Sequence, residues 1–300
     1  MVKIAYSDRF VLPLPEGHRF PMLKYELVKE QLLREGTVEE NQLFDPGLCD
    51  LETVLLTHDA NYVARFQNLQ LTDYEIRRIG FPMSELTVKR CFSTNQGTLS
   101  AALNALENGV GLNIAGGTHH AFRDKGEGFC MLNDIAVSAN YLLNKQLAKQ
   151  ILVIDLDVHQ GNGTAKIFET EPKVFTFSMH GADNYPLKKE NSDLDIGLKD
   201  STNDELYLRI LADNLEPLIN RVKPDFIFYQ SGVDILETDK LGKLAMSRQG
   251  CKTRDEMVFE SCKKNQIPLA VCMGGGYSER LTDIVEAHCN TFRLAMDYWG

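Results

Sequence analysis

The stretch ILVIDLDVHQGNG, residues 151–163, joins an apolar run to three titratable residues, Asp155, Asp157 and His159. A continuous apolar run is typical of a strand that is buried on both faces of a parallel sheet. Side chains two residues apart lie on the same face of a strand, so the three groups point the same way. Burying them together is costly unless a cation compensates their charge. The stretch therefore predicts a buried strand that ends at a metal site, with an ion-pair cluster at the edge of the sheet as the alternative.

Five continuous apolar runs, separated by segments with helical periodicity, occupy the C-terminal two-thirds of the chain. They predict strands over 111–116, 150–157, 173–179, 225–232 and 268–275, and a further strand is expected over 3–6. Helices are expected over 21–36, 84–109, 132–146, 163–169, 203–222, 254–265 and 278–299, where Gly97 allows a break and Pro217 a kink. This alternation predicts an α/β fold, an open parallel sheet flanked by helices on both faces. A chain of 300 residues, 43% of them hydrophobic, suits a single domain over 1–300.

Polar residues follow these runs at nearly every carboxyl end. The runs lead in turn into THH, DLDVHQGNG, SMHG, VD and GGGY. The carboxyl ends of parallel strands lie at one edge of the sheet, where α/β proteins bind their ligands. We therefore expect the active site at this edge.

Three of these polar residues are candidate metal ligands. Asp157 and His159 offer a carboxylate and an imidazole, both of which zinc accepts, and Asp234 follows the next strong apolar run. Three protein ligands would leave a position open for water and substrate, as in catalytic sites. Asp155 lies one step deeper and is better placed to orient a neighbouring imidazole. An aspartate that follows glycine, as Asp234 does, can also be an ordinary turn or helix-cap residue.

The other polar residues at this edge offer acid–base groups. His119 and His120, beside a metal-activated water, could deprotonate it and later protonate a leaving amine. The phenol of Tyr277, after three glycines, could donate a hydrogen bond to a developing oxyanion. Each motif taken alone could be an ordinary loop or turn. Together they indicate metal-dependent hydrolysis of an amide or related acyl bond.

The composition argues against several classes of protein. With 42 acidic and 32 basic residues the formal net charge is -10, and no Lys/Arg cluster predicts a nucleic-acid partner. The N-terminus lacks the layout of a signal peptide, and no apolar run is long enough for a membrane span. The seven cysteines form no C-x-x-C pair, which favours buried free thiols in a cytoplasmic protein.

Five motifs in order resemble the zinc-dependent histone deacetylase family, and the likeness runs from about residue 4 to 293. These motifs are GGTHHAFRDKGEGFCMLND (116–134), VIDLDVHQGNGT (153–164), FSMH (177–180), SGVDILETDKLG (231–242) and GGGYS (274–278). The segments DVHQGNG, DILETDKLGKLAMS and RDEMVF look most like the class IV branch and its bacterial relatives, and LPEGHRFPMLKY looks like bacterial members.

The resemblance implies a three-layer fold of the arginase–deacetylase type and assigns roles to residues of this chain. Zinc would lie on Asp157, His159 and Asp234, with His119 and His120 as the tandem imidazoles and His120 as general base and acid. Asp155 would hold His119, and Tyr277 would polarise the acyl carbonyl. The substrate tunnel would be lined by Gly128, Phe129, Tyr185 and Gly275. A structural monovalent cation, usually potassium, would lie near Asp155 and Ser178 and the carbonyls of Asp157, His159 and Met179.

The leading hypothesis is therefore an amidohydrolase that removes an acyl group, acetyl or longer, from lysine side chains. Family substrates also include acetylated polyamines and small acyl compounds, and class IV relatives are associated with long-chain fatty acyl-lysine. A two-metal ureohydrolase on the same fold would need more carboxylates around DLDVH than are visible. A silent binding module for acylated amines would be expected to lack a ligand, a histidine or Tyr277, yet all are present.

One departure from the family pattern predicts a difference in pH dependence. Many class I members place an aspartate where this chain has Asn162, as the partner of the second histidine. An amide carries no charge to stabilise an imidazolium, so we expect a lower pKa for His120 than in those relatives. Asn162→Asp should raise that pKa and move the acidic limb of the kcat/KM profile to higher pH, because this limb reports loss of the free base. A move of the limb to lower pH would contradict this reasoning.

Overall fold

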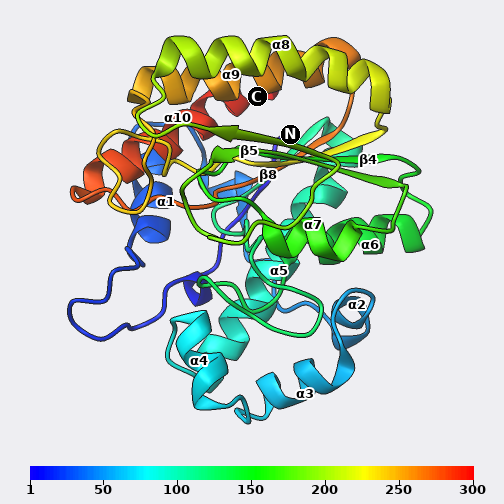
Figure 1. Ribbon diagram of the computed structural model, residues 1–300, viewed down its shortest axis with the longest axis vertical. Helices are drawn as coiled ribbons and strands as arrows, with labels where there is room; N and C mark the ends of the chain where they lie inside the picture. The colour runs from blue at the N-terminus through cyan, green and yellow to red at the C-terminus, as the bar shows by residue number, and fades with distance from the viewer.

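Eight strands form one all-parallel sheet at the centre of the computed structural model, which describes residues 1–300 (Figure 1). Their order across the sheet is β2-β1-β3-β8-β7-β4-β5-β6. The strands are β1 (Ile4–Ala5), β2 (Leu43–Phe44), β3 (Val110–Asn113), β4 (Ile151–Asp155), β5 (Val174–Gly181), β6 (Leu194–Leu198), β7 (Phe226–Gln230) and β8 (Leu269–Cys272). The predicted open parallel sheet is confirmed, and each of the five apolar runs overlaps one of its strands.

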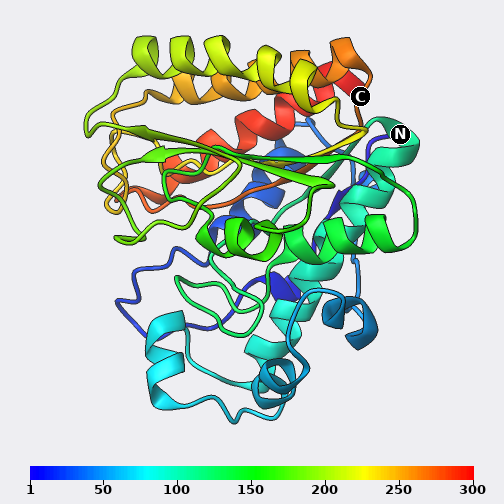
Figure 2. The ribbon, with the colours of Figure 1, turned by 45° about the vertical axis from the view of Figure 1, so that its right-hand side comes forward.

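Helices cover both faces of this sheet. In the two ribbon views α8, α9 and α10 lie on one face and α5, α6 and α7 on the other, while α2, α3 and α4 form a separate group at one end of the molecule (Figures 1 and 2). The helices are α1 (Lys24–Arg34), α2 (Leu51–Leu55), α3 (Ala60–Gln67), α4 (Asp73–Ile79), α5 (Glu85–Asn108), α6 (Asp134–Asn144), α7 (Asn162–Phe168), α8 (Asp204–Val222), α9 (Arg248–Asn265) and α10 (Leu281–Trp299), and two short 3₁₀ turns span Asp8–Phe10 and Glu40–Gln42. None of these helices combines the length and apolarity that crossing a membrane requires.

The apolar run of β4 is continuous because the strand divides two separate cores. The side chains of Leu152 and Ile154 belong to the larger apolar cluster, and those of Ile151 and Val153 belong to the smaller one. Alternate side chains of a strand point to opposite faces, so a strand covered by helices on both sides must be apolar throughout. The apolar run ends at Asp155, where the strand reaches the edge of the sheet.

The long helix α5 has clear start and stop signals. The Ser84 side chain accepts a hydrogen bond from the backbone N–H of Thr87, and Gly109 ends the helix in the left-handed conformation, with φ 84°. The helix is uninterrupted at Gly97. A Cβ atom at that position would lie 2.7 Å from Oδ1 of Asn113, so the glycine lets the helix approach β3 closely and does not break it.

Several elements differ from the sequence prediction. The two edge strands β2 and β6 and the helices α2, α3 and α4 were not predicted. Helix α9 begins at Arg248, six residues before the predicted start at Arg254, because the Ser247 side chain caps it by accepting from the N–H of Gly250. Its first turn is polar and carries no apolar periodicity. Helix α8 continues through Pro217 without ending there.

A glycine in β3 makes the packing of α5 on the sheet testable. A Cβ at Gly111 would lie 2.0 Å from the carbonyl oxygen of Ala101 in α5, and a backbone atom cannot move aside as a side chain can. We expect Gly111→Ala to lower the free energy of unfolding by about 1–3 kcal/mol, as overpacking does. Urea denaturation measures this. The control is Gly197→Ala in β6, where the nearest atom would be the Ala182 Cβ at 3.4 Å. Equal stability of the two variants would contradict the packing argument.

Candidate active site

The loops that follow β4, β7 and β8 meet at the carboxyl edge of the sheet, as the sequence predicts. The strands β8, β7 and β4 are neighbours in the sheet. Asp155 at the end of β4 pairs in register with Gln230 of β7 and Ser178 of β5, so the strand ends lie level. The candidate ligands that follow β4 and β7 are therefore brought side by side.

Asp157, His159 and Asp234 form a buried group in which one ligand atom from each lies within 4.8 Å of the others. Nδ1 of His159 donates to Oδ1 of Asp157 and to Oδ2 of Asp234, both at 3.1 Å. The backbone N–H of Val158 donates to the other oxygen of Asp234 at 2.9 Å, which ties the two loops together. Three converging side chains with this chemistry could hold a metal ion.

Gly275 lies directly against the carboxylates of this group. Its backbone N–H donates to Oδ2 of Asp157 at 2.7 Å, and a Cβ at this position would lie 1.9 Å from Oδ2 of Asp234. Only glycine allows this approach. The sequence prediction assigns Gly275 to substrate binding, and the structure places it at the wall of a small inner pocket of about 40 Å³, beyond the wider outer pocket.

The pKa values of Asp157, His159 and Asp234 are shifted because two carboxylates and one imidazole are buried next to each other. Burial lowers the pKa of His159, but its hydrogen bonds to Asp157 and Asp234 outweigh this and raise it to about 10. Burial and the charge of Asp157 raise the pKa of Asp234 to about 7. Burial opposes the ionised form of Asp157, yet His119 and His159 hold its pKa well below the usual value. A divalent cation would replace the proton that these three groups share.

The two histidines lie beside this group, each with its own partner. Nδ1 of His119 donates to Oδ2 of Asp155 at 2.7 Å, and Nδ1 of His120 donates to Oδ1 of Asn162, also at 2.7 Å. Burial lowers the pKa of His119, but the charges of Asp155 and Asp157 outweigh this and raise it. Burial and the charges of His119 and His159 lower the pKa of His120 well below its usual value. The two rings are therefore electrostatically distinct, and the comparison with relatives that carry an aspartate at 162 stays a prediction.

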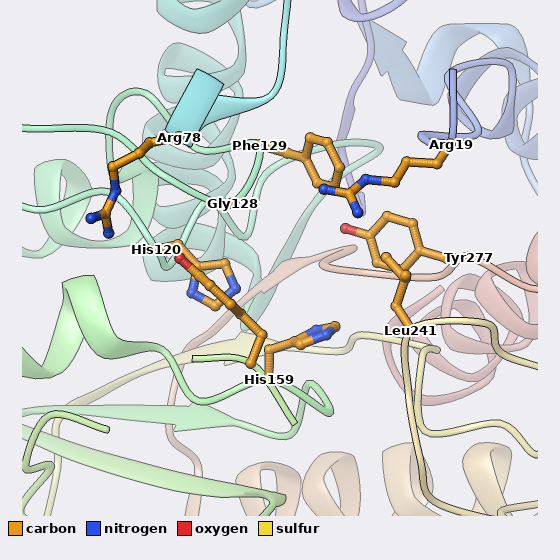
Figure 3. A pocket seen from close by; sticks show the side chains of 9 residues that line it. Arg19, Arg78, His120, Gly128, Phe129, His159, Leu241 and Tyr277 are labelled. Carbon is orange, nitrogen blue, oxygen red and sulfur yellow. The ribbon is translucent and has the colours of Figure 1, made fainter. Parts of the chain in front are cut away.

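An open pocket of about 220 Å³ leads to these side chains. Figure 3 shows His120 and His159 at its floor, with the Tyr277 hydroxyl pointing into it from the opposite side to His120. Its lining residues are Arg19, Arg78, His120, Gly128, Phe129, His159, Tyr185, Leu241 and Tyr277. Burial and the charges of Asp234 and Asp157 raise the pKa of Tyr277 well above its usual value, so the phenol keeps its proton at neutral pH. Three of the four predicted tunnel residues thus line the pocket.

The comparisons with known proteins agree with this geometry. Residues 18–292 match the family described as the histone deacetylase domain. The chain belongs to the histone deacetylase family.

Relatives and a solved structure extend this assignment. The chain is 44% identical to an uncharacterized protein of Picosynechococcus sp., over 99% of both chains. It is 29% identical to histone deacetylase 2 of Arabidopsis thaliana, over 95% of this chain and 76% of that one. It is 27% identical to the acetoin utilization protein AcuC of Staphylococcus aureus, over 80% and 67%. The crystal structure of the HDA15 HD domain superposes with a TM-score of 0.82 at 20% identity, over 96% and 89%, which confirms the arginase/deacetylase-like fold. The closer likeness to class IV stays a prediction.

The residues predicted for a monovalent cation also lie together, on β4, β5 and the loop after β4. Asp155 and Ser178 are register partners on adjacent strands. The carbonyl oxygens of Asp157 and His159 accept no hydrogen bond from the chain, which leaves them free for a cation. Potassium at this place stays a prediction.

Five residues at the site were not singled out from the sequence. Arg19, Arg78 and Leu241 line the pocket, and Glu127 lies behind it against Asn162. Lys24 is fully buried and donates from Nζ to the carbonyl of Gly274 at 3.0 Å. Two of these had a sequence signal. Lys24 stands at an apolar-face position of the helix over 21–36, and Glu127 stands between two glycines in the same motif as the His pair.

Removal of one carboxylate tests the metal group. We expect Asp234→Asn to lose its bound metal after exposure to zinc and dialysis, because the amide replaces an anionic ligand and leaves His159 with a single carboxylate partner. Metal content by mass spectrometry should fall from about one equivalent per chain to background. The matched control, Asp213→Asn on the exposed face of α8, should retain the metal. Full zinc content in Asp234→Asn would show that the ligand set is wrong.

Proposed function

We propose that this chain is a zinc-dependent amidohydrolase that removes a short acyl group from lysine side chains of proteins or peptides. Family membership by itself supports amide deacetylase activity in general. The observation that carries the finer proposal is one pocket that His159 of the three-residue metal group lines, with His120 and Tyr277 on opposite sides of it. This is the set of groups that hydrolysis of an acyl bond needs.

The donor set fits zinc. Asp157, His159 and Asp234 would hold it, and two carboxylates with one imidazole leave room for water and a substrate oxygen. When bound, zinc supplies a Lewis acid that polarises the acyl carbonyl and makes water more acidic. Both carboxylate ligands are themselves oriented, by Gly275 N–H at Asp157 and by Val158 N–H at Asp234.

The remaining steps belong to side chains of the chain itself. His120 is neutral at neutral pH because of its low pKa, and its Nδ1 is occupied by Asn162, so Nε2 is free to take a proton from water. The Tyr277 phenol donates a hydrogen bond to the carbonyl oxygen as negative charge develops there. His120 then returns its proton to the leaving amine. Asp155 holds His119 beside it, with the ring centroids of the two histidines 4.1 Å apart.

The charges around the pocket favour acyl-lysine over an acetylated polyamine. Arg19 and Arg78 both line the pocket, and no carboxylate does. Glu127 offsets the charge of Arg78, whereas Arg19 forms no ion pair and lies over the Phe129 ring, with its Cζ 5.2 Å from the ring centroid. A polyamine would bring further ammonium groups toward these like charges, which costs binding energy. A lysine in a peptide brings only the neutral acylated nitrogen.

The inner pocket favours a short acyl group. Its volume is about 40 Å³, room for only a few waters, since a cavity needs roughly 10–15 Å³ to hold one. Phe20, Tyr25 and Arg90 are among the residues that line it, and all three are buried. We therefore propose acetyl as the preferred group.

We also propose a cytoplasmic location. The seven cysteines are all buried and free, which supports it.

The test is a panel of acylated amines with zinc-loaded enzyme. Acetyl-, butyryl-, octanoyl- and myristoyl-lysine in one peptide, and acetylspermidine, are compared by kcat/KM with and without a chelator. We expect acetyl-lysine to be fastest, acetylspermidine to be slow, and the chelator to abolish all turnover. Faster release of myristoyl would overturn the proposed acyl length. No turnover of any acyl amine by metal-loaded protein would favour a binding module.

Removal of the Tyr277 hydroxyl tests its role as hydrogen-bond donor to the oxyanion. Tyr277→Phe should keep metal and fold but lower kcat by roughly 10²–10³, because the developing oxyanion loses its donor. The measurement is steady-state hydrolysis of the acetyl-lysine peptide, with zinc content checked in parallel. Tyr141→Phe in α6, whose ring packs against the smaller apolar cluster and does not line the pocket, is the control and should leave kcat unchanged. An unchanged rate in Tyr277→Phe would remove the tyrosine from the mechanism.

A further inference from the structure

A buried carboxylate, Glu127, lies one side chain beyond His120. Nδ2 of Asn162 donates to Oε1 of Glu127 at 2.7 Å, and Oδ1 of the same amide accepts from Nδ1 of His120 at 2.7 Å. The Glu127 side chain is only 4% exposed, and its other oxygen forms an ion pair with Arg78 at the pocket rim. The four residues form one continuous chain of hydrogen bonds that begins at the pocket floor and returns to its mouth.

The charge of Glu127 decides the direction of these hydrogen bonds. An ionised carboxylate only accepts, so the NH₂ group of Asn162 must face Glu127 and its oxygen must face His120. An amide oxygen also only accepts, so Nδ1 of His120 must carry the hydrogen. The proton of a neutral imidazole is then held on Nδ1, and Nε2 is left as the basic nitrogen that faces the pocket. Without the carboxylate, the amide could turn over and present NH₂ to His120, which would require the opposite tautomer.

The backbone around Glu127 holds it in this place. The N–H of Gly128 donates to the carbonyl of Arg78 at 3.1 Å, and the N–H of Phe129 donates to that of Ile79 at 2.7 Å, so the loop is tied to the end of α4. A Cβ at Gly128 would lie 2.7 Å from Cδ2 of His120, so the loop lies directly against the imidazole. Arg78 supplies the charge that a buried carboxylate needs.

This arrangement also explains why an amide stands at 162. An aspartate there would place two carboxylates at the 2.7 Å separation now spanned by a hydrogen bond, and like charges at that distance cannot both ionise. The neutral amide of Asn162 avoids this repulsion. Because Glu127 sets the direction of the amide, it also sets the tautomer of His120. In the sequence Asn162 is an isolated loss of charge, whereas in the folded protein the carboxylate of Glu127 lies next to it.

We propose that Glu127 is a positioning residue for catalysis, which acts through Asn162 to hold His120 in the tautomer whose Nε2 accepts the proton from water. The proposal rests on the proposed function, in which His120 is the general base and acid. Glu127 and Asn162 then act as a pair of one carboxylate and one amide. Exchanging the two groups between the two positions should preserve the function of the pair.

The test is a double-mutant cycle on the zinc-loaded enzyme with the acetyl-lysine peptide. In Glu127→Gln the amide of Asn162 loses its fixed direction, and in Asn162→Asp the two carboxylates conflict, so kcat should fall at least about tenfold in each with little change in KM. In the double variant the new glutamine can donate to the new aspartate, which accepts from His120 as before. Its kcat should return to within about threefold of the wild type. Glu286→Gln, whose carboxylate accepts from Gln31 far from the pocket, is the control and should leave kcat unchanged.

Two kinetic results would overturn the proposal. One is an unchanged kcat in Glu127→Gln. The other is a double variant whose thermal stability recovers while its kcat does not, because that would make the pair merely structural. ¹⁵N NMR of labelled histidine in the unmutated protein provides a test without turnover, and His120 should show hydrogen on Nδ1. Hydrogen on Nε2 would overturn the proposal even if every variant misfolds. If His120 has the expected tautomer but no acyl amine is hydrolysed, the proposed function fails and the positioning of the ring stands.

Discussion

The burial of several charges at one edge of an apolar sheet is the constraint on which the site depends. Asp157, His159 and Asp234 are all buried, and every carboxylate oxygen of Asp157 and Asp234 has a hydrogen-bond partner in the protein. Burying an unpaired charge would cost far more than a domain can spare. The loops that carry these residues therefore have little freedom, and a glycine at 275 is required where backbone meets carboxylate.

A second buried charge holds these loops from the interior. Arg254 of α9 is fully buried beside Asp255, and its Nη1 donates to the carbonyls of Leu156 and Gly232 at 3.2 and 2.6 Å. Those carbonyls belong to the loops after β4 and β7, which carry the candidate ligands. The guanidinium fork suits this task because it presents several donors in a fixed plane. The helix on one face of the sheet thus sets the spacing of groups at its edge.

The buried histidines on the acid–base side of the pocket also have protein partners, and these partners differ between His119 and His120. Asp155 raises the pKa of His119, whereas burial and the neighbouring imidazoles lower that of His120. Two adjacent histidines of one motif therefore differ in protonation because their neighbours differ. The partner of His120 is neutral, and the nearest carboxylate on that side, Glu127, reaches it only through an amide. The pocket rim is linked to the same chain of hydrogen bonds through Arg78.

The sequence by itself determined the fold class and most of the candidate site. Continuous apolar runs and helical periodicity are local properties, so the buried strands and the polar residues at their carboxyl ends could be predicted. Asp157, His159, Asp234, both histidines and Tyr277 were all named in this way, and the structure brings them to one edge. The tertiary structure alone decided the strand order, which makes β4 and β7 neighbours and lets Asp234 meet Asp157.

Tertiary structure also decided what surrounds those groups. Arg19 lines the pocket and Glu127 lies behind it, each on a loop whose position depends on packing against distant elements, and no periodicity marks such residues. The first turn of α9 and the edge strands β2 and β6 form where a cap or a neighbouring strand stabilises segments of weak intrinsic pattern. Residues that act by their own chemistry could thus be found in the sequence. The role of Glu127, which acts through Asn162, was visible only once the chain was folded, because its partner lies far away along the chain.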